Sequence, residues 1–177
     1  MRRDVLELRQ FYATPLGRAA REMVARKVVE TWDDARDMDV LGLGYATPFL
    51  GGAVLPQARR IVAAMPAQQG VELWPAEGRN LACLAEEDAL PFQNAFFDRI
   101  LAVHALEESP DPVALLREVW RVLSPTGRVV VVTAARNGLW ANAERTPFGH
   151  GRPYTRSQLA DLLREAELEP TGWTRAL

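Results

Sequence analysis

The stretch Glu86-Glu87-Asp88-Ala89-Leu90-Pro91-Phe92 is the part of the chain that decides its fold class. Phe97-Asp98 follows it and leads into the apolar run of residues 99–103, which is typical of a buried strand. Apolar residues at helical spacing then lead to Arg121-Val122-Leu123, and a turn joins them to the valine run 129–132. An unbroken valine run favours a strand buried on both faces of a parallel sheet, so this half of the chain indicates an α/β fold.

The same alternation of helix and strand patterns continues in both directions along the chain. Thr14-Pro15, Asp111-Pro112 and the capping box of Thr155 and Gln158 mark the starts of three predicted helices. Residues 134–153 lack periodicity and are predicted to form a long loop. Strands are predicted over residues 39–44, 60–65, 81–85, 100–105 and 129–133, and residues 170–175 have the composition to begin a sixth strand.

Helical spacing also predicts which residues of the first two helices face the core. The predicted face of the first helix consists of Leu16, Ala20, Met23, Val24, Val28 and Trp32. The predicted face of the second consists of Val113, Leu116, Trp120 and Leu123.

The composition describes one ordinary globular domain. The chain has 177 residues, of which 48% are hydrophobic, and this is enough for a sizeable core. A net charge of −2 does not favour nucleic acid or anionic lipid as a partner. The single cysteine, Cys83, excludes an intramolecular disulfide and suits a reducing cytoplasm. No apolar run follows the basic start Met1-Arg2-Arg3, so neither a signal peptide nor a membrane span is expected, and no set of metal ligands is predicted.

The order of these motifs resembles the class I methyltransferases that use S-adenosylmethionine, and in particular the type 11-like methyltransferase domain. The family's wording there is an acidic residue, Leu-Pro-Phe, Phe-Asp and Arg-Val-Leu-x-Pro-Gly-Gly. This chain resembles it over residues 86–98 and 121–127, with Thr126 in place of the first glycine. The resemblance implies a Rossmann-like doubly wound, mostly parallel sheet with helices on both faces. It also implies a final antiparallel strand for which no residues remain, so that strand is expected to be missing. An uncovered sheet edge would favour oligomer formation.

The resemblance assigns the cofactor to the ends of the first three strands, where this chain departs from the family. Gly44 keeps the first turn glycine of the family's glycine motif, whereas Gly42 replaces an acidic residue, Ala46 the second glycine and Pro48 the third. Losing the acid removes a hydrogen-bond acceptor, which is worth about 1.5–3 kcal/mol if it meets the cofactor's ammonium group. Pro48 removes an N–H donor.

The ends of the second and third strands are expected to hold the adenosine part of the cofactor. Met65 stands near the position where the family carries a carboxylate for the ribose, with Gln68, Gln69 and Glu72 as possible substitutes. Glu86 or Glu87 is expected to accept the adenine amine, because a carboxylate is an acceptor for that donor. A solvated acidic turn is the alternative interpretation of the same residues.

Three residues are weak candidates for the chemistry. A methyl transfer needs a general base only if the acceptor must lose a proton. His104 is expected at the end of the fourth strand and His150 in the long loop, although either could be an ordinary histidine. Tyr12 lies in residues 1–35, which resemble the helical lid segment that many of these enzymes place over the cofactor, ahead of a methyltransferase-like domain at residues 36–177.

Two functions therefore stay open from the sequence. The first is a methyltransferase that uses S-adenosylmethionine on an unidentified small-molecule or protein acceptor. The second is a catalytically inactive methyltransferase-like domain that serves as a binding or regulatory partner, which Gly42, Pro48 and Met65 favour. A nicotinamide-dependent dehydrogenase is a weaker third, because no third glycine follows Gly44 and no acid ends the second strand.

Overall fold

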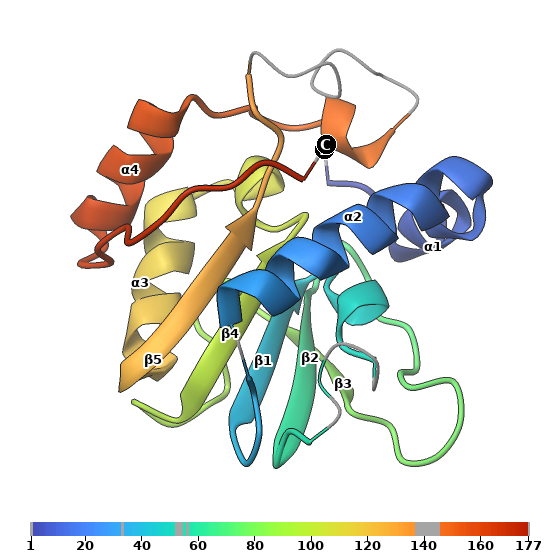
Figure 1. Cartoon of the computed structure of the whole chain (residues 1–177), viewed down its shortest axis with the longest axis horizontal. Helices are drawn as coiled ribbons and strands as arrows, with labels where there is room; N and C mark the ends of the chain where they lie inside the picture. The colour runs from blue at the N-terminus through green and yellow to red at the C-terminus, as the bar shows by residue number, and fades with distance from the viewer. Residues whose placement is uncertain (1, 33, 52–54, 56, 137–145, 177) are drawn as a thin grey trace.

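The chain forms a five-stranded sheet in which every pair of neighbouring strands is parallel (Figure 1). The computed structural model describes residues 2–32, 34–51, 55, 57–136 and 146–176. The sheet order is β3-β2-β1-β4-β5. The strands are β1 (Asp39–Gly44), β2 (Arg60–Pro66), β3 (Ala82–Ala85), β4 (Phe97–Val103) and β5 (Leu123–Val132). This arrangement confirms the predicted Rossmann-like α/β fold.

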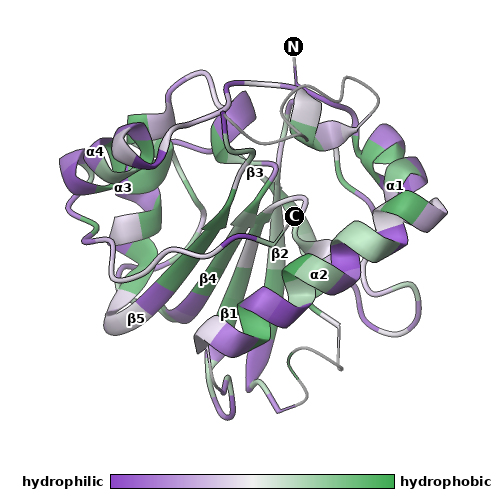
Figure 2. Ribbon diagram, turned by 45° about the horizontal axis from the view of Figure 1, so that its top comes forward, coloured by the Kyte–Doolittle hydropathy of each residue, from purple (hydrophilic) through white to green (hydrophobic). Residues whose placement is uncertain are grey.

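Helices cover both faces of the sheet, as predicted. Helices α1 (Val5–Ala13) and α2 (Pro15–Trp32) share one core cluster with Val40 of β1. Helices α3 (Pro112–Val122) and α4 (Arg156–Glu165) share the other cluster with Leu41. Neighbouring residues of a strand point to opposite faces, which is why a continuous apolar run serves both clusters. Figure 2 shows the strands as mostly hydrophobic, with polar segments in β4 and β5, while α2 alternates between polar and apolar bands.

The strand order fixes where a ligand site is expected. The chain passes from β1 outward to β2 and β3 and then returns to place β4 on the other side of β1. The loops that follow β1 and β4 therefore diverge at the carboxyl end of the sheet, which is where open α/β sheets bind ligands. His104, the residue after β4, lies at this point.

The structure corrects several details of the predicted elements. Helix α1, capped by the side chain of Asp4, was not predicted. Residues 170–176 contain no strand, so the sixth strand was wrong. Residues 67–81, between β2 and β3, contain no helix and form turns around Gly70 and the Trp74-Pro75 peptide bond. Strand β4 runs over residues 97–103 and not 100–105.

The predicted buried faces were right only in part. Helix α2 buries Ala20, Val24, Val28 and Trp32, whereas Leu16 and Met23 are 51% and 44% exposed. Helix α3 buries Leu115, Leu116, Val119 and Val122, whereas Trp120 is 48% exposed. In both helices the apolar stripe is wider than the side that the sheet covers, so the sequence alone did not identify the face that packs.

Within the described ranges, none of the helices is long and apolar enough to cross a bilayer. The same ranges contain no cluster of three or more His, Cys, Asp or Glu side chains that could hold a metal ion. Most of the predicted loop 134–153, namely residues 137–145, lies outside the described residues.

Candidate functional site

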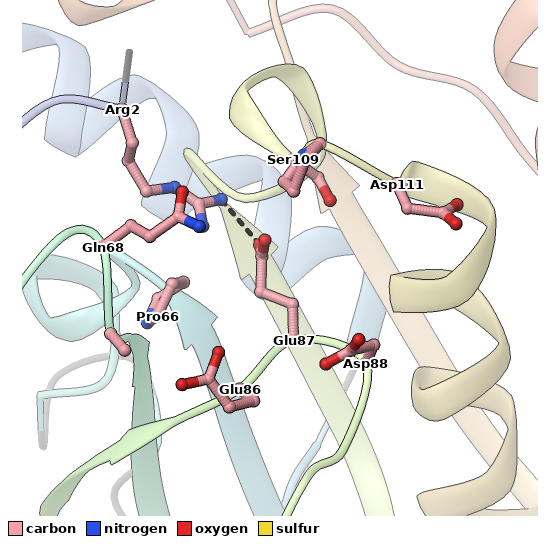
Figure 3. A pocket seen from close by; sticks show the side chains of 10 residues that line it. Arg2, Pro66, Gln68, Glu86, Glu87, Asp88, Ser109 and Asp111 are labelled. Carbon is pink, nitrogen blue, oxygen red and sulfur yellow. Dashed lines mark hydrogen bonds and ion pairs between the residues drawn. The ribbon is translucent and has the colours of Figure 1, made fainter.

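A cleft of about 130 Å³ opens at the carboxyl end of the sheet, between the segments that follow β2 and β3 and the residues that precede α3 (Figure 3). Its lining residues are Arg2, Pro66, Ala67, Gln68, Glu86, Glu87, Asp88, Ser109, Pro110 and Asp111. Four of these ten are acidic, and Arg2 is the one basic residue among the described residues of the lining. The cleft is therefore suited to a ligand that donates hydrogen bonds or carries positive charge.

The two carboxylates predicted for the adenine amine both line this cleft. Glu86 is exposed at the end of β3, where its backbone forms a bridge with Ala89. The Glu87 side chain is only 12% exposed and accepts a hydrogen bond from Arg2. The acidic turn is held against α3, because the Glu118 carboxylate accepts from the backbone N–H of Leu90 at 2.7 Å.

The structure places three other predicted cofactor residues in the core and away from the cleft. Gly42, Ala46 and Met65 are buried, and Ala46 and Met65 belong to the cluster that packs under α1 and α2. A Cβ atom at Gly42 would lie 2.5 Å from Cδ1 of Leu50 and 2.9 Å from Cβ of Ala46. The acidic residue that the family carries at this position would therefore require Leu50 and Ala46 to move.

Gly44 is the glycine of the motif whose backbone conformation requires glycine. Its φ is +79°, and a Cβ atom would collide with the carbonyl oxygen of Val103. The Tyr45 N–H donates to that same oxygen at 2.7 Å, while the carbonyl of Gly44 accepts from Gln69 Nε2 at 3.4 Å. The turn after β1 is thus closely packed against β4 and against the loop after β2.

The segment after this turn has few backbone N–H groups with which to bind an anion. It contains a 3-10 helix of only three residues, Thr47–Phe49, in which Pro48 has no N–H to donate. Glu72, one of the possible substitutes for the ribose carboxylate, lies here and not in the cleft. It accepts from the Thr47 hydroxyl at 3.2 Å. Burial raises the pKa of Tyr45, and the nearby Glu72 carboxylate adds to this effect.

Two of the three candidate catalytic residues, Tyr12 and His104, share a buried hydrogen bond, and the Glu107 carboxylate lies beside the histidine. The hydroxyl of Tyr12 and Nε2 of His104 are 2.8 Å apart, and His104 Nδ1 lies 3.3 Å from Glu107 Oε1. The side chains of His104 and Glu107 are both fully buried. His150 is exposed and does not take part. Glu107 was not predicted as a site residue, although the His-x-x-Glu spacing in a short turn was the signal that could have found it.

The surroundings of these side chains keep the Tyr12 phenol neutral, and the backbone of His104 is strained. Burial raises the pKa of Tyr12 well above its ordinary value, and the nearby Glu107 carboxylate adds to this effect. The Tyr12 ring stacks on Tyr45 with ring centres 5.8 Å apart, and the His104 ring lies 4.8 Å from Phe148. His104 has a φ of +50°, a conformation that non-glycine residues adopt at a cost of about 1–3 kcal/mol and that is common at functional sites.

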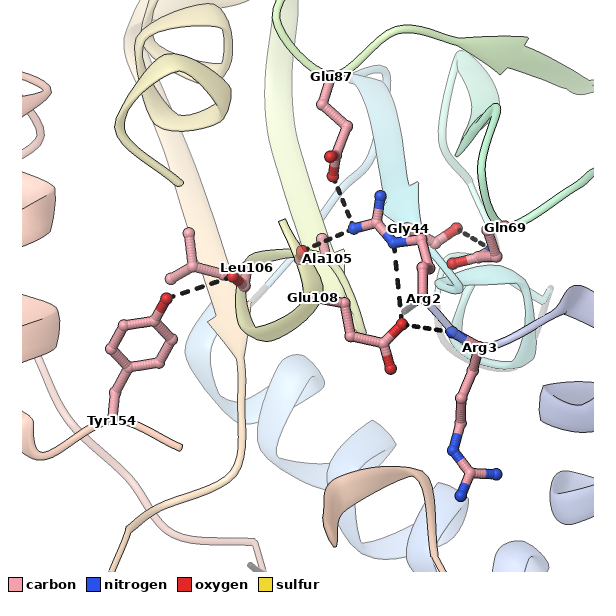
Figure 4. Close-up of polar contacts among 9 residues, drawn as sticks. All are labelled: Arg2, Arg3, Gly44, Gln69, Glu87, Ala105, Leu106, Glu108 and Tyr154. Carbon is pink, nitrogen blue, oxygen red and sulfur yellow. Dashed lines mark hydrogen bonds and ion pairs between the residues drawn. The ribbon is translucent and has the colours of Figure 1, made fainter. Parts of the chain in front are cut away.

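Arg2 connects the acidic cleft to the loop that carries His104 (Figure 4). Its Nη2 donates to Glu87 Oε1 at 2.6 Å and to the carbonyl oxygen of Ala105 at 2.8 Å. Its Nε lies 3.9 Å from Glu108 Oε2, which also accepts from the backbone N–H of Arg3 at 2.7 Å. No sequence motif indicated this role, because the partners lie 85 and 103 residues away.

Comparison with known proteins identifies the family. A model of the methyltransferase domain matches residues 41–131, which is more than half of the chain and extends from within β1 to within β5. The chain belongs to this methyltransferase domain family. This confirms the resemblance to the class I methyltransferases that use S-adenosylmethionine.

Relatives of this methyltransferase domain are distant. A demethylmenaquinone methyltransferase of Lactococcus lactis is 33% identical over 79 residues, which are 44% of this chain and 31% of that protein. An uncharacterized protein of Mycobacterium tuberculosis is 26% identical over 174 residues, or 93% of this chain and 58% of that protein. The chain thus spans less than two thirds of the length of these relatives.

Solved structures share the fold at low identity. A 1,6-didemethyltoxoflavin-N1-methyltransferase of Burkholderia thailandensis, solved with bound S-adenosylhomocysteine, aligns with a TM-score of 0.65 and 22% identity. The alignment covers 89% of this chain and 71% of that one. The [4+2]-cyclase SpnF aligns with a TM-score of 0.60 and 23% identity over 81% of this chain and 56% of its own. These neighbours show the fold alone.

Proposed function

We propose that this methyltransferase domain binds S-adenosylmethionine at the acidic cleft and transfers its methyl group to an acceptor that gives a proton to His104. The observation that carries the proposal is the position of the cleft. It lies at the carboxyl ends of β2 and β3 and carries Glu86 and Glu87, at the place where the family resemblance expects the adenosine. The ligand would be a cation, and the lining is predominantly acidic.

The residues present fit one half of the cofactor better than the other. Glu86 can accept from the adenine amine, and the amide of Gln68 offers a donor and an acceptor for the ribose in place of the missing carboxylate. With Arg2 in place, however, the cleft is smaller than the 300–1,000 Å³ that is roughly typical of ligand pockets.

The buried dyad of His104 and Glu107 supplies the chemistry that the chain itself would perform. Bound S-adenosylmethionine supplies a methyl group that its sulfonium already activates. The Glu107 carboxylate beside Nδ1 favours the tautomer in which that nitrogen carries the proton, which leaves Nε2 free to accept one. In this structure Nε2 contacts the Tyr12 hydroxyl, so an acceptor O–H or N–H would take the place of that hydroxyl when the lid segment moves.

The acceptor class that the related proteins favour is a small molecule. The Lactococcus lactis relative and the Burkholderia thailandensis neighbour are named for demethylmenaquinone and 1,6-didemethyltoxoflavin. A location in the cytoplasm is also part of the proposal, because the half-buried free thiol of Cys83 suits a reducing compartment. Association through the edge strands β3 and β5 stays a prediction that size-exclusion chromatography would test.

The test is a calorimetric titration of the purified protein with S-adenosylmethionine and with S-adenosylhomocysteine. Saturable binding with a Kd in the micromolar range supports the proposal and justifies a screen of acceptors with labelled cofactor. Once an acceptor is found, Glu107→Gln should lower the rate more than the affinity for cofactor, because Glu107 lies beside His104 Nδ1 and outside the cleft. If the folded protein does not bind either ligand at millimolar concentration, the proposed function is contradicted.

The second candidate function is a methyltransferase-like domain without catalysis, which acts as a binding partner. One observation favours it: Gly42, which stands in place of the family's motif acid, packs against Leu50 in the core, so restoring the acid would require the core to rearrange. The fold does not decide between the two, because SpnF shares it and is named a cyclase.

A further inference from the structure

The guanidinium group of Arg2 lies where the proposed function requires a positively charged ligand. Its side chain is 1% exposed and is wedged between the loops that follow β3 and β4. One nitrogen, Nη2, donates to both the Glu87 carboxylate and the Ala105 carbonyl (Figure 4). The Glu108 carboxylate lies 3.9 Å from Nε.

These three partners form a subsite that needs a cation. The Glu87 and Glu108 side chains are 12% and 3% exposed, and Ala105 is 1% exposed. Two buried carboxylates without a positive partner would repel each other and would lose their hydration. Removing Arg2 and leaving nothing in its place is therefore costly, whereas exchanging it for another cation is not.

Arg2 itself satisfies this subsite incompletely. A guanidinium carries five N–H donors, and those on Nε and Nη1 are buried without a hydrogen-bond partner among the described residues. Each such group loses its interaction with water and gains nothing in return. A compact ammonium group would satisfy the same acceptors with fewer unpaired donors. The resident cation is thus one that a better ligand can displace.

We propose that Arg2 is a tethered competitor of the cofactor, whose guanidinium occupies the subsite that takes the ammonium group of S-adenosylmethionine. This inference rests on the proposed function. Arg2 also forms part of the cleft wall, so its release removes both the competing charge and part of the barrier to a full-sized ligand. Because it belongs to the same chain, its effective concentration at the subsite is high, on the order of millimolar for a short tether.

The competitor is linked to the lid. Arg2 lies two residues before the Asp4 cap of α1, and α1 carries the Tyr12 hydroxyl that contacts His104. The same segment therefore covers the cation subsite with its first residues and the dyad with its last turn. Cofactor binding would displace Arg2 from the cation subsite and weaken the contact between Tyr12 and His104.

The experiment is calorimetric titration of S-adenosylmethionine and S-adenosylhomocysteine into the wild-type protein, Arg2→Ala and Arg2→Met. Arg3→Ala is the matched control, because its side chain pairs with Glu7 and lies outside the cleft. Circular dichroism and thermal unfolding establish that each variant is folded, and Arg2→Met keeps the apolar stem if Arg2→Ala is too unstable. Loss of a charge-assisted competitor should lower the Kd of both ligands about tenfold or more, whereas Arg3→Ala should leave it unchanged.

The outcomes separate the inference from the function on which it rests. Tighter binding by both Arg2 variants, or binding by these variants alone, supports the inference. Equal or weaker binding by the folded Arg2 variants overturns it and leaves the proposed function standing. Absence of binding by every folded protein in the series overturns the proposed function and the inference together.

Discussion

Restoring the family's motif acid at position 42 should damage this protein. Gly42→Ala adds one carbon that would lie 2.5 Å from Leu50 Cδ1 and 2.9 Å from Ala46 Cβ, whereas ordinary contacts begin near 3.4 Å. Leu50 is 1% exposed, so it has little space into which to move. Overpacking of this kind costs about 1–3 kcal/mol, and the lower chain entropy that alanine brings returns about 0.5–1 kcal/mol. The expected net loss is about 1–2 kcal/mol.

Gly42→Asp should cost more, because it adds a buried carboxylate with no cation beside it. The expected loss is about 3–5 kcal/mol, a large share of the 5–15 kcal/mol that is roughly typical of a domain. Urea denaturation followed by circular dichroism measures both variants. Gly172→Ala is the control, because nothing lies within 4 Å of a Cβ atom there. Gly42→Ala with Leu50→Ala should lose less than the sum of the two single variants.

One result would refute this reasoning. If Gly42→Asp is as stable as the wild-type protein and also binds S-adenosylmethionine more tightly, then the chain has lost only the motif acid, and one substitution restores it. The packing of Leu50 would then have no part in the departure from the family.

Two further predictions concern pH and the acidic turn. Burial raises the pKa of all three tyrosines: Tyr12, Tyr45 and Tyr154. The unfolded chain therefore loses these protons near pH 10, while the folded protein keeps them. The free energy of unfolding should fall above about pH 10, and tyrosinate absorbance should appear only when the protein unfolds. Reversible titration of the tyrosines near pH 10 with an unchanged circular dichroism spectrum would contradict this. Arg121→Ala should lower the free energy of unfolding by about 2 kcal/mol, as measured by urea denaturation, because Arg121 donates to Glu118 and to two carbonyl oxygens of the acidic turn. The exposed Arg164→Ala is the control and should lower it by almost nothing. Arg121 lowers the pKa of Glu118, so the contribution of this carboxylate is present above its ordinary pKa and lost as the pH falls through the lowered value; an equal acid dependence in Arg121→Ala would show that the pair is not coupled.

The sequence by itself determined the sheet and the turns that build its carboxyl end. The apolar run of β4 predicts a strand buried on both faces, and the structure confirms this. The valine run of β5 also predicts a strand, but β5 lies at an edge of the sheet and its valines are only half-buried, so the expectation that it is buried on both faces was wrong. The acidic turn before Leu90-Pro91-Phe92 predicted the cleft lining, since Glu86 follows β3 directly. These features are local, and the chain's own chemistry over a few residues is enough to fix them.

Only the tertiary structure decided what fills the site. Helix α1 spans nine residues, a length at which isolated helices are marginal, so packing and not propensity stabilises it. Its Tyr12 meets His104 across 92 residues of sequence, and Arg2 meets Ala105 across 103. Contacts of this range depend on which loops the strand order brings to one edge of the sheet. For the same reason the packing of Leu50 against Gly42, which the family's acid would require to rearrange, became visible only in three dimensions.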